Sequence, residues 1–286
     1  MLTPEEWRAV QLSLLVGTVA VAASLAPAIA IAWLLARWRG PGRWLLQGLV
    51  DLPLVLPPVV TGYLLLVLLG PRGPIGLALE THLGLRLAFT WWGAAVASAV
   101  VSFPLMVRAI RGAFQSIDPR LERAARSLGA GPLAVFWTVT LPLARHGLVA
   151  GCLLGFARSI GEFGATIMLA GDIPGETRTI PLAIYSLGSR VGGLDEAWRL
   201  VVVAIALAFA ALLIGEHIDR RSHALLSYDP VQDMRDAIDK LRYQTGRVRT
   251  QIPRRRGFGT DVQGSRNPDR IQARRSPAVR QSVERP

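Results

Sequence analysis

Residues 118–142 read DPRLERAARSLGAGPLAVFWTVTLP, a charged segment that lies between two long apolar stretches. Asp118 can cap the N-terminus of a helix, and Pro119 suits the first turn, where a missing N–H costs nothing. Four apolar residues then recur at helical spacing along one face: Leu121, Ala124, Ala125 and Leu128. Gly129 follows where this helix is expected to end. The pattern predicts a helix closed by a sharp turn.

A second, shorter helix is expected after that turn. Gly131 and Pro132 mark the turn, and three apolar residues then share one side: Leu133, Phe136 and Trp137. The opposite face of the first helix is filled by polar residues: Arg120, Glu122, Arg123, Arg126 and Ser127. Periodicity alone describes a charged interfacial hairpin between two membrane spans.

Composition divides the chain into two parts. The 286 residues combine a mean hydropathy of +0.36 with an isoelectric point near 11.3, which do not fit one soluble domain. Residues 1–223 carry a net charge of +5, and residues 224–286 carry +7. We therefore expect a membrane body, residues 1–221, and a basic cytoplasmic tail, residues 222–286, too poor in apolar residues to fold alone. The tail is expected to contact anionic lipid, and no nucleic acid is expected as a partner.

The body is expected to be an all-α membrane domain. A bilayer core of about 30 Å needs about 20 apolar residues in a helix. Five stretches meet this length: residues 10–36, 52–70, 88–107, 147–170 and 198–217. Pro53, Pro57 and Pro58 interrupt the second stretch. We expect about five transmembrane helices, with six as the alternative.

Arginine bias predicts the orientation of these spans. Placing the hairpin in the cytoplasm puts eleven loop arginines on that side and six on the other. Five spans then place the N-terminus outside and the C-terminus in the cytoplasm.

The fourth stretch contains charges in an apolar setting. Arg158 and Glu162 stand four residues apart, as in an intrahelical pair that faces the bundle. The same face is also a candidate for the border of a translocation path. Gly164 permits close helix approach, and the Thr166 hydroxyl either faces a pore or bonds back to its own helix.

Residues 171–188 form the loop expected on the outer side. Arg178 and Thr179 are candidates for receiving an anion there. In the alternative that we favour, Arg178 pairs with Glu176 or Asp172 and only shapes the loop.

Catalytic and metal-binding motifs are missing from the sequence. The single lysine, Lys240, follows an aspartate, so no Gly-Lys pair of a Walker A loop occurs. Cys152 lies in an apolar run, and the four histidines are scattered. We expect a chain that is no enzyme and binds no metal or cofactor, with ATP and Mg²⁺ held by a separate subunit.

The hairpin resembles a known motif. Ala124-Ala125, Gly129 and the later Val139, Leu141 and Pro142 have the spacing of the EAA loop of bacterial ABC importer permeases. Arg123 stands where many members carry a glutamate, and the acid here is Glu122. The resemblance implies a coupling helix that docks on an ABC ATPase. The coupling residues it implies are Leu121, Glu122, Ala124, Ala125, Leu128, Gly129 and Pro142.

Several segments of the body resemble one branch of that family. Residues 52–66, 102–114, 156–166 and 173–185, together with the hairpin, look like the permease of the molybdate/tungstate ABC importer, and the similarity runs over about residues 1–221. The resemblance implies a type I importer fold in a bacterial or archaeal cell membrane and import by alternating access. It implies a second permease copy, two ATPase subunits and an extracytoplasmic oxyanion-binding protein as partners. The pore or gate candidates are Pro57, Pro58, Arg158, Glu162, Gly164 and Thr166.

Two alternatives stay open at this point. A sulfate/thiosulfate permease shares the hairpin and the GEFG-type segment, although the GETRTIP segment favours molybdate or tungstate. A membrane scaffold that does not transport, with a tail that recruits a partner, is the alternative from another class.

Overall fold

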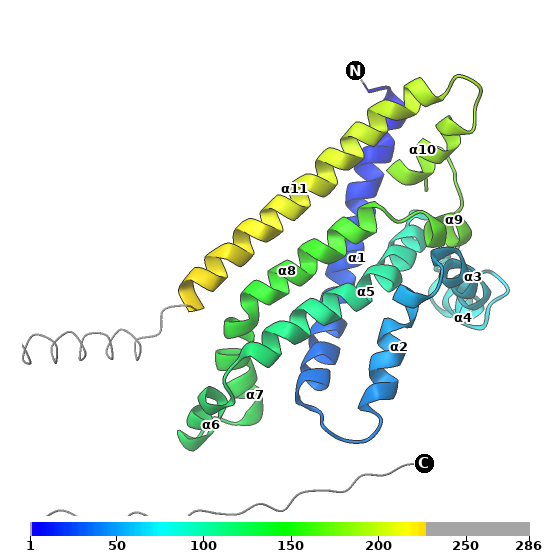
Figure 1. The fold of residues 1–286 in the computed structure, drawn as a ribbon. Helices are drawn as coiled ribbons and strands as arrows, with labels where there is room; N and C mark the ends of the chain where they lie inside the picture. The colour runs from blue at the N-terminus through cyan, green and yellow to red at the C-terminus, as the bar shows by residue number, and fades with distance from the viewer. Residues whose placement is uncertain (1, 227–286) are drawn as a thin grey trace, which may run out of the picture. The chain divides into compact units, whose positions relative to one another are not determined.

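The structure of the protein is a computed structural model that describes residues 2–226, with side chains described as far as Gly215. All regular elements in that range are helical (Figure 1). They are α1 (Pro4–Arg37), α2 (Arg43–Val55), α3 (Pro58–Leu69), α4 (Pro74–Leu83), α5 (Trp91–Ser116), α6 (Pro119–Ser127), α7 (Pro132–Val135), the π-helix η1 (Phe136–Thr140), α8 (Leu141–Ile160), α9 (Gly164–Ala170), α10 (Ile180–Gly188) and α11 (Leu194–Leu226). The predicted all-α class is confirmed. The predicted basic tail lies outside the described residues, except for its first residues, which continue α11.

Helix α1 is the longest element and carries a complete N-terminal cap. The Thr3 hydroxyl accepts a hydrogen bond from the Glu6 N–H at 3.3 Å, and the Glu6 carboxylate accepts one from the Thr3 N–H at 2.6 Å. This capping box satisfies two backbone donors that the first turn leaves without partners. The helix therefore begins six residues before the apolar stretch that predicted it.

The core of the body lies where α1, α5 and α8 pack together. Leu35, Met106, Ile110 and Phe114 are among its fully buried side chains. Gly155 allows the close approach of α8, because an added Cβ would lie 2.6 Å from the Met106 Cγ. Small residues at helix contacts are typical of membrane bundles, in which helices associate by close packing.

The second predicted span is a bent pair of helices. α2 and α3 meet at an angle of 110° across Leu56 and Pro57. Pro57 has no N–H, and Pro58 occupies the first position of α3, so the bend leaves few backbone donors without partners. Four single helices in the described range are long and apolar enough to span a membrane, or five spans if the bent pair counts as one.

The prediction of one helix over residues 147–170 is wrong. α8 ends at Ile160, and α9 begins only at Gly164. The Glu162 N–H turns back to the Ser159 carbonyl at 3.2 Å, and the Glu162 carboxylate accepts a hydrogen bond from the Ala165 N–H at 2.7 Å. The carboxylate thus binds a free donor in the first turn of α9, which stabilises a new helix start inside an apolar segment.

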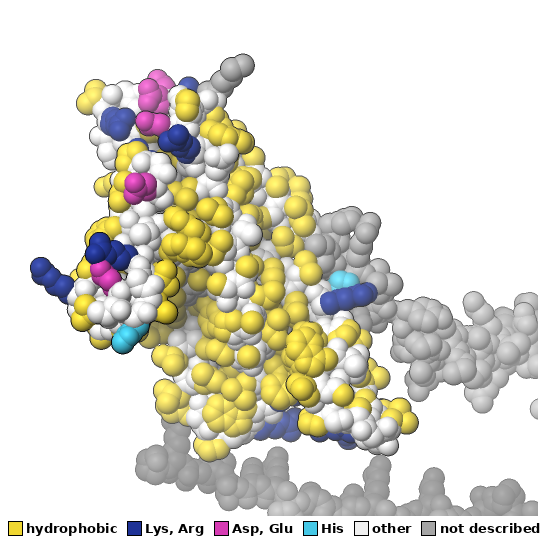
Figure 2. Space-filling model, turned by 180° about the vertical axis from the view of Figure 1, so that it is seen from behind, with side chains coloured by type: hydrophobic (Ala, Val, Ile, Leu, Met, Phe, Trp, Pro, Cys, Tyr) yellow, Lys and Arg dark blue, Asp and Glu magenta, His cyan; other side chains and the backbone are white. Residues whose placement is uncertain are grey.

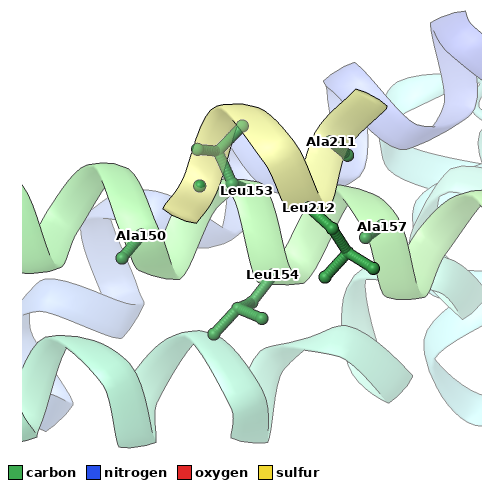
Figure 3. A pocket seen from close by; sticks show the side chains of 7 residues that line it. Ala150, Leu153, Leu154, Ala157, Ala211 and Leu212 are labelled. Atoms are coloured by element: carbon green, nitrogen blue, oxygen red, sulfur yellow. The ribbon is translucent and has the colours of Figure 1, made fainter. Parts of the chain in front are cut away.

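The surface of the body fits a membrane. On the face drawn in Figure 2, hydrophobic side chains cover the middle, acidic side chains lie toward the top and the left edge, and basic side chains lie toward both the top and the bottom. An apolar groove of about 250 Å³ runs between α8 and α11, lined by alanine, leucine and glycine (Figure 3). Exposed apolar surface of this extent belongs against lipid or another membrane protein.

Candidate functional site

The hairpin of α6, α7 and η1 has both of the helix ends that the sequence predicted. The Asp118 carboxylate accepts a hydrogen bond from the Arg120 N–H at 2.8 Å, which confirms the predicted cap. At the other end Gly129 has a φ of +89°, and the Ala130 N–H donates to the Ala125 carbonyl at 3.1 Å. With the bond from the Gly129 N–H to the Arg126 carbonyl, this is a Schellman motif, in which glycine is favoured because it has no Cβ.

The outer surface of the hairpin is apolar and uncovered. Leu128 is 90% exposed and Leu133 is 70% exposed, and Leu121 and Trp137 are also exposed. The predicted stripe of α6 therefore faces away from the body. Phe136 departs from the prediction, since it packs inward against Trp33 and Phe114, with ring centroids 5.8 and 6.4 Å away.

Glu122 is the main correction to the predicted hairpin. Periodicity assigned it to the polar face with the arginines, but the residue is only 8% exposed. Its carboxylate accepts hydrogen bonds from the Arg37 guanidinium and, at 2.8 Å, from the Thr140 hydroxyl. Since Arg37 belongs to α1 and Thr140 is buried at the base of the hairpin, Glu122 points away from the exposed surface.

Pro142 acts through the backbone at the base of the hairpin. It lies in the first turn of α8, directly after the π-helix, where the Leu141 N–H donates to the Phe136 carbonyl five residues back. Proline cannot donate to the carbonyl four residues before it and clashes with that carbonyl. A widened turn relieves this clash, so Pro142 accounts for the π-helix that presents Thr140 to Glu122.

A second cluster lies where the two broken spans meet. α3 packs against α9, and Gly164 lies against Pro58, because an added Cβ would be 2.8 Å from the Pro58 Cβ. Gly62 is equally close to α9, because an added Cβ there would be 2.7 Å from the Ala165 Cα. The structure therefore brings together two candidates, Pro58 and Gly164, that are 106 positions apart in the sequence. Irregular backbone at membrane depth is tolerated where protein buries it or where it lines a cavity.

Arg158 and Glu162 form the predicted ion pair beside this break. The Arg158 Nη1 and the Glu162 Oε2 are 2.8 Å apart, and the side chains are 28% and 1% exposed. The pair spans the end of α8 rather than one helix face. The Thr166 hydroxyl donates to the carbonyls of Phe163 (2.8 Å) and Glu162 (3.2 Å), so it bonds back to its own helix, the second of the two predicted options.

The loop before α10 is a closed network. The Arg178 Nε donates to the Asp172 carboxylate at 2.6 Å, which confirms the pairing that we favoured over anion binding. Ser186 donates to the same carboxylate. Thr179 is buried and precedes α10, whose first N–H, from Ile180, donates to the Ser13 hydroxyl of α1 at 2.7 Å.

Three long-range ion pairs of the described residues and one helix were not predicted from the sequence. Arg37 meets Glu122, Glu6 meets Arg199 at 3.0 Å, and Asp51 meets Arg108 at 3.0 Å. Each pair joins residues at least 57 positions apart, so no local pattern signals it. α4 did carry a local signal, since Gly73-Pro74 begins it and Gly84 ends it with a φ of +65°.

Comparison with known protein families identifies relatives of this chain. Residues 28–222 match the family of binding-protein-dependent transport system inner membrane components. The molybdenum transport system permease protein ModB of Escherichia coli is 55% identical over 222 residues, which are 78% of this chain and 97% of that protein. ModB of Haemophilus influenzae is 50% identical over 80% of this chain and 100% of that protein.

More distant matches agree in family and in fold. The sulfate transport system permease protein CysW of Synechococcus elongatus is 35% identical over 72% of this chain and 68% of that protein. A crystal structure of a bacterial alginate ABC transporter with its periplasmic protein has a TM-score of 0.61 at 20% identity, covering 77% of this chain and 80% of that chain. This likeness shows the fold of an ABC importer permease, as predicted. The chain belongs to the family of binding-protein-dependent transport system inner membrane components, in the branch of the molybdenum permeases.

Proposed function

We propose that this chain forms the translocation path of an ATP-driven importer for molybdate or tungstate. The identity of 55% to a molybdenum permease, against 35% to a sulfate permease, supports this substrate class over sulfate. Family membership also argues against the scaffold that does not transport.

The exposed surface of the hairpin supports the proposal that ATP hydrolysis occurs on a separate subunit. Leu121, Leu128, Leu133 and Trp137 present apolar surface at a helix end that is rigidly capped. Exposed apolar surface of this kind, rimmed by arginines, is typical of a protein interface. Two ABC ATPase subunits, each with ATP and Mg²⁺, would dock on two such hairpins, and this chain would bind no nucleotide, metal or other cofactor.

Arg158 supports a path that two permease copies share. A charged side chain within a membrane domain faces the bundle interior or a water-filled cavity, and Arg158 is 28% exposed in the single copy. A second copy of this chain, or water in a path between two copies, would provide that surrounding. An extracytoplasmic oxyanion-binding protein would then deliver the anion at the end that contains α10. The path needs only weak, polar contacts, since a tight site would hold the anion.

The test separates ATPase docking from membrane insertion. Ala125→Glu places a charge beside the exposed apolar surface, and Gly129→Asp forces a side chain into a positive φ. Both variants should reach normal abundance in membranes, because neither residue lies in a span, and should lose most of the ATPase that copurifies with wild type. Gly84→Asp is the matched control: that glycine also ends a helix with positive φ and open space around it, but it lies in α4.

The substrate is tested on the reconstituted complex. Permease, ATPase and binding protein should hydrolyse ATP faster with molybdate or tungstate than with sulfate. Stimulation by sulfate alone would contradict the substrate class. Normal ATPase retention and normal uptake in Ala125→Glu would contradict the docking surface.

A further inference from the structure

One carboxylate oxygen of the hairpin joins α6 to η1 within the hairpin and to α1 outside it. The Glu122 Oε1 accepts hydrogen bonds from the Arg37 Nη2 and from the Thr140 Oγ1. Arg37 is the last residue of α1, and Thr140 is the last residue of η1. These partners are 85 and 18 positions from Glu122, so the bonds are part of the tertiary fold.

The junction is only partly open to water. Thr140 is fully buried, Glu122 is nearly so, and the Arg37 side chain is 27% exposed. Leu35 and Ile117, which precede Arg37 and Glu122 in the chain, belong to the buried core. A partly buried ion pair is screened less by salt than an exposed surface pair.

Helix α1 has a second set of polar anchors at its other end. The Glu6 carboxylate accepts hydrogen bonds from Arg199 of α11 at 3.0 and 3.2 Å, and the Ser13 hydroxyl accepts one from the first N–H of α10. The 34 residues of α1 span about 50 Å at the rise of an α-helix. One helix is therefore anchored to the hairpin at one end and to α10 and α11 at the other (Figure 1).

We propose that Arg37 and Thr140 are positioning residues: Arg37 holds the hairpin on α1 through Glu122, and Thr140 holds the Glu122 carboxylate in place within the hairpin. A displacement of the hairpin is then carried along α1 to α10 and α11 at the opposite end of the body. Glu122, which faces the body, serves this tether and does not contact the ATPase. This inference rests on the proposed coupling role of the hairpin.

The test measures how much molybdate is taken up for each ATP hydrolysed. Proteoliposomes would hold the permease variant with its ATPase, and the binding protein would be added outside with molybdate. Arg37→Met should retain the ATPase but lower uptake per ATP about tenfold, within the range of measured coupling between sites. Thr140→Val removes the weaker, uncharged hydrogen bond and should lower uptake per ATP less than Arg37→Met does. Arg39→Met is the control, since it removes the same charge at an exposed position two residues away.

A double variant separates the tether from simple charge neutralisation. Arg37→Met leaves Glu122 buried without its cation, so abundance in membranes should fall. Arg37→Met with Glu122→Leu removes both charges, and abundance should recover while uptake per ATP stays low. Recovery of uptake per ATP in the double variant would overturn the tether, as would an unchanged ratio in Arg37→Met.

The ATPase that copurifies distinguishes this inference from the docking proposal. Retained ATPase in Glu122→Leu supports a residue that faces the body, and lost ATPase in that variant would mean that Glu122 contacts the ATPase. If Ala125→Glu loses the ATPase while Arg37→Met keeps the wild-type uptake per ATP, the docking surface is supported and only the tether is contradicted.

Discussion

Buried acidic residues in this protein each face an arginine. Among the residues whose side chains are described, the buried glutamates are Glu6, Glu122 and Glu162, and their partners are Arg199, Arg37 and Arg158. A lone charge at these places would have to be neutralised or hydrated at considerable cost, whereas a pair offsets part of that cost. The pairs differ in what else they do. Glu6 and Glu162 also accept backbone N–H groups at helix starts, and Glu122 binds a hydroxyl instead.

The pair beside the helix break leads to a prediction for single and double substitutions. Arg158→Met leaves the fully buried Glu162 without its cation, and breaking a buried pair in this way costs about 3–5 kcal/mol, less here because Arg158 is partly exposed. Glu162→Gln should cost less, because the amide oxygen still accepts from the Ala165 N–H. The double variant should be more abundant in membranes than Arg158→Met alone. The measurements are abundance and the Tm of the permease in detergent, and wild-type values for Arg158→Met would show that the pair does not stabilise the fold.

At the bend between α2 and α3 and the break between α8 and α9, α3 and α9 contact each other through glycines. Gly62 of α3 and Gly164 of α9 let the backbones approach, and the bend at Pro57 directs α3 toward α9. In membrane bundles such contact replaces the hydrophobic driving force that lipid cannot provide. The pore candidates Pro58 and Gly164 therefore lie in a pair of short helices, each a fragment of an interrupted span.

Packing of α3 on α9 is tested by two glycine substitutions. Gly62→Ala places a Cβ 2.7 Å from the Ala165 Cα, so the helices must separate, and overpacking of this kind costs about 1–3 kcal/mol. Gly48→Ala is the matched control, because Gly48 lies in α2 with nothing within 4 Å of an added Cβ. We expect a lower Tm and reduced uptake for Gly62→Ala only. Equal Tm values for the two variants would mean that the contact contributes no stability.

At the scale of the whole body, the hairpin and the loop before α10 lie toward opposite ends of α1. Glu122 binds the last residue of α1, and Arg199 and Ile180 bind residues near its start. The arginine bias of the loops predicts that the hairpin end lies in the cytoplasm. A helix of 34 residues is longer than the apolar core of a bilayer, so both anchored ends fall near the membrane surfaces.

Cysteine labelling tests this orientation. Cys152 is first replaced by alanine, and single cysteines are placed at Leu128 and at Val191, both of which are exposed. A thiol reagent that does not cross membranes should label Val191→Cys in intact cells and Leu128→Cys only after the cells are opened. Labelling of Leu128→Cys from outside would contradict both the orientation and the coupling role of the hairpin.

Much of this fold was determined by local sequence. Local sequence was enough to predict the apolar stretches that can span a bilayer, the Asp118 cap, the Gly129 helix end and the proline interruption at residues 57–58. Each of these depends on neighbouring residues, because span length, capping and backbone φ are set by local chemistry. Tertiary structure alone decided the inward position of Glu122 and the packing of α9 against the bend at Pro58. These features depend on side chains and backbone groups that come together only when distant helices pack. Periodicity places Glu122 among the arginines of α6, but a buried carboxylate turns to the cation that satisfies it, and that cation is 85 residues away.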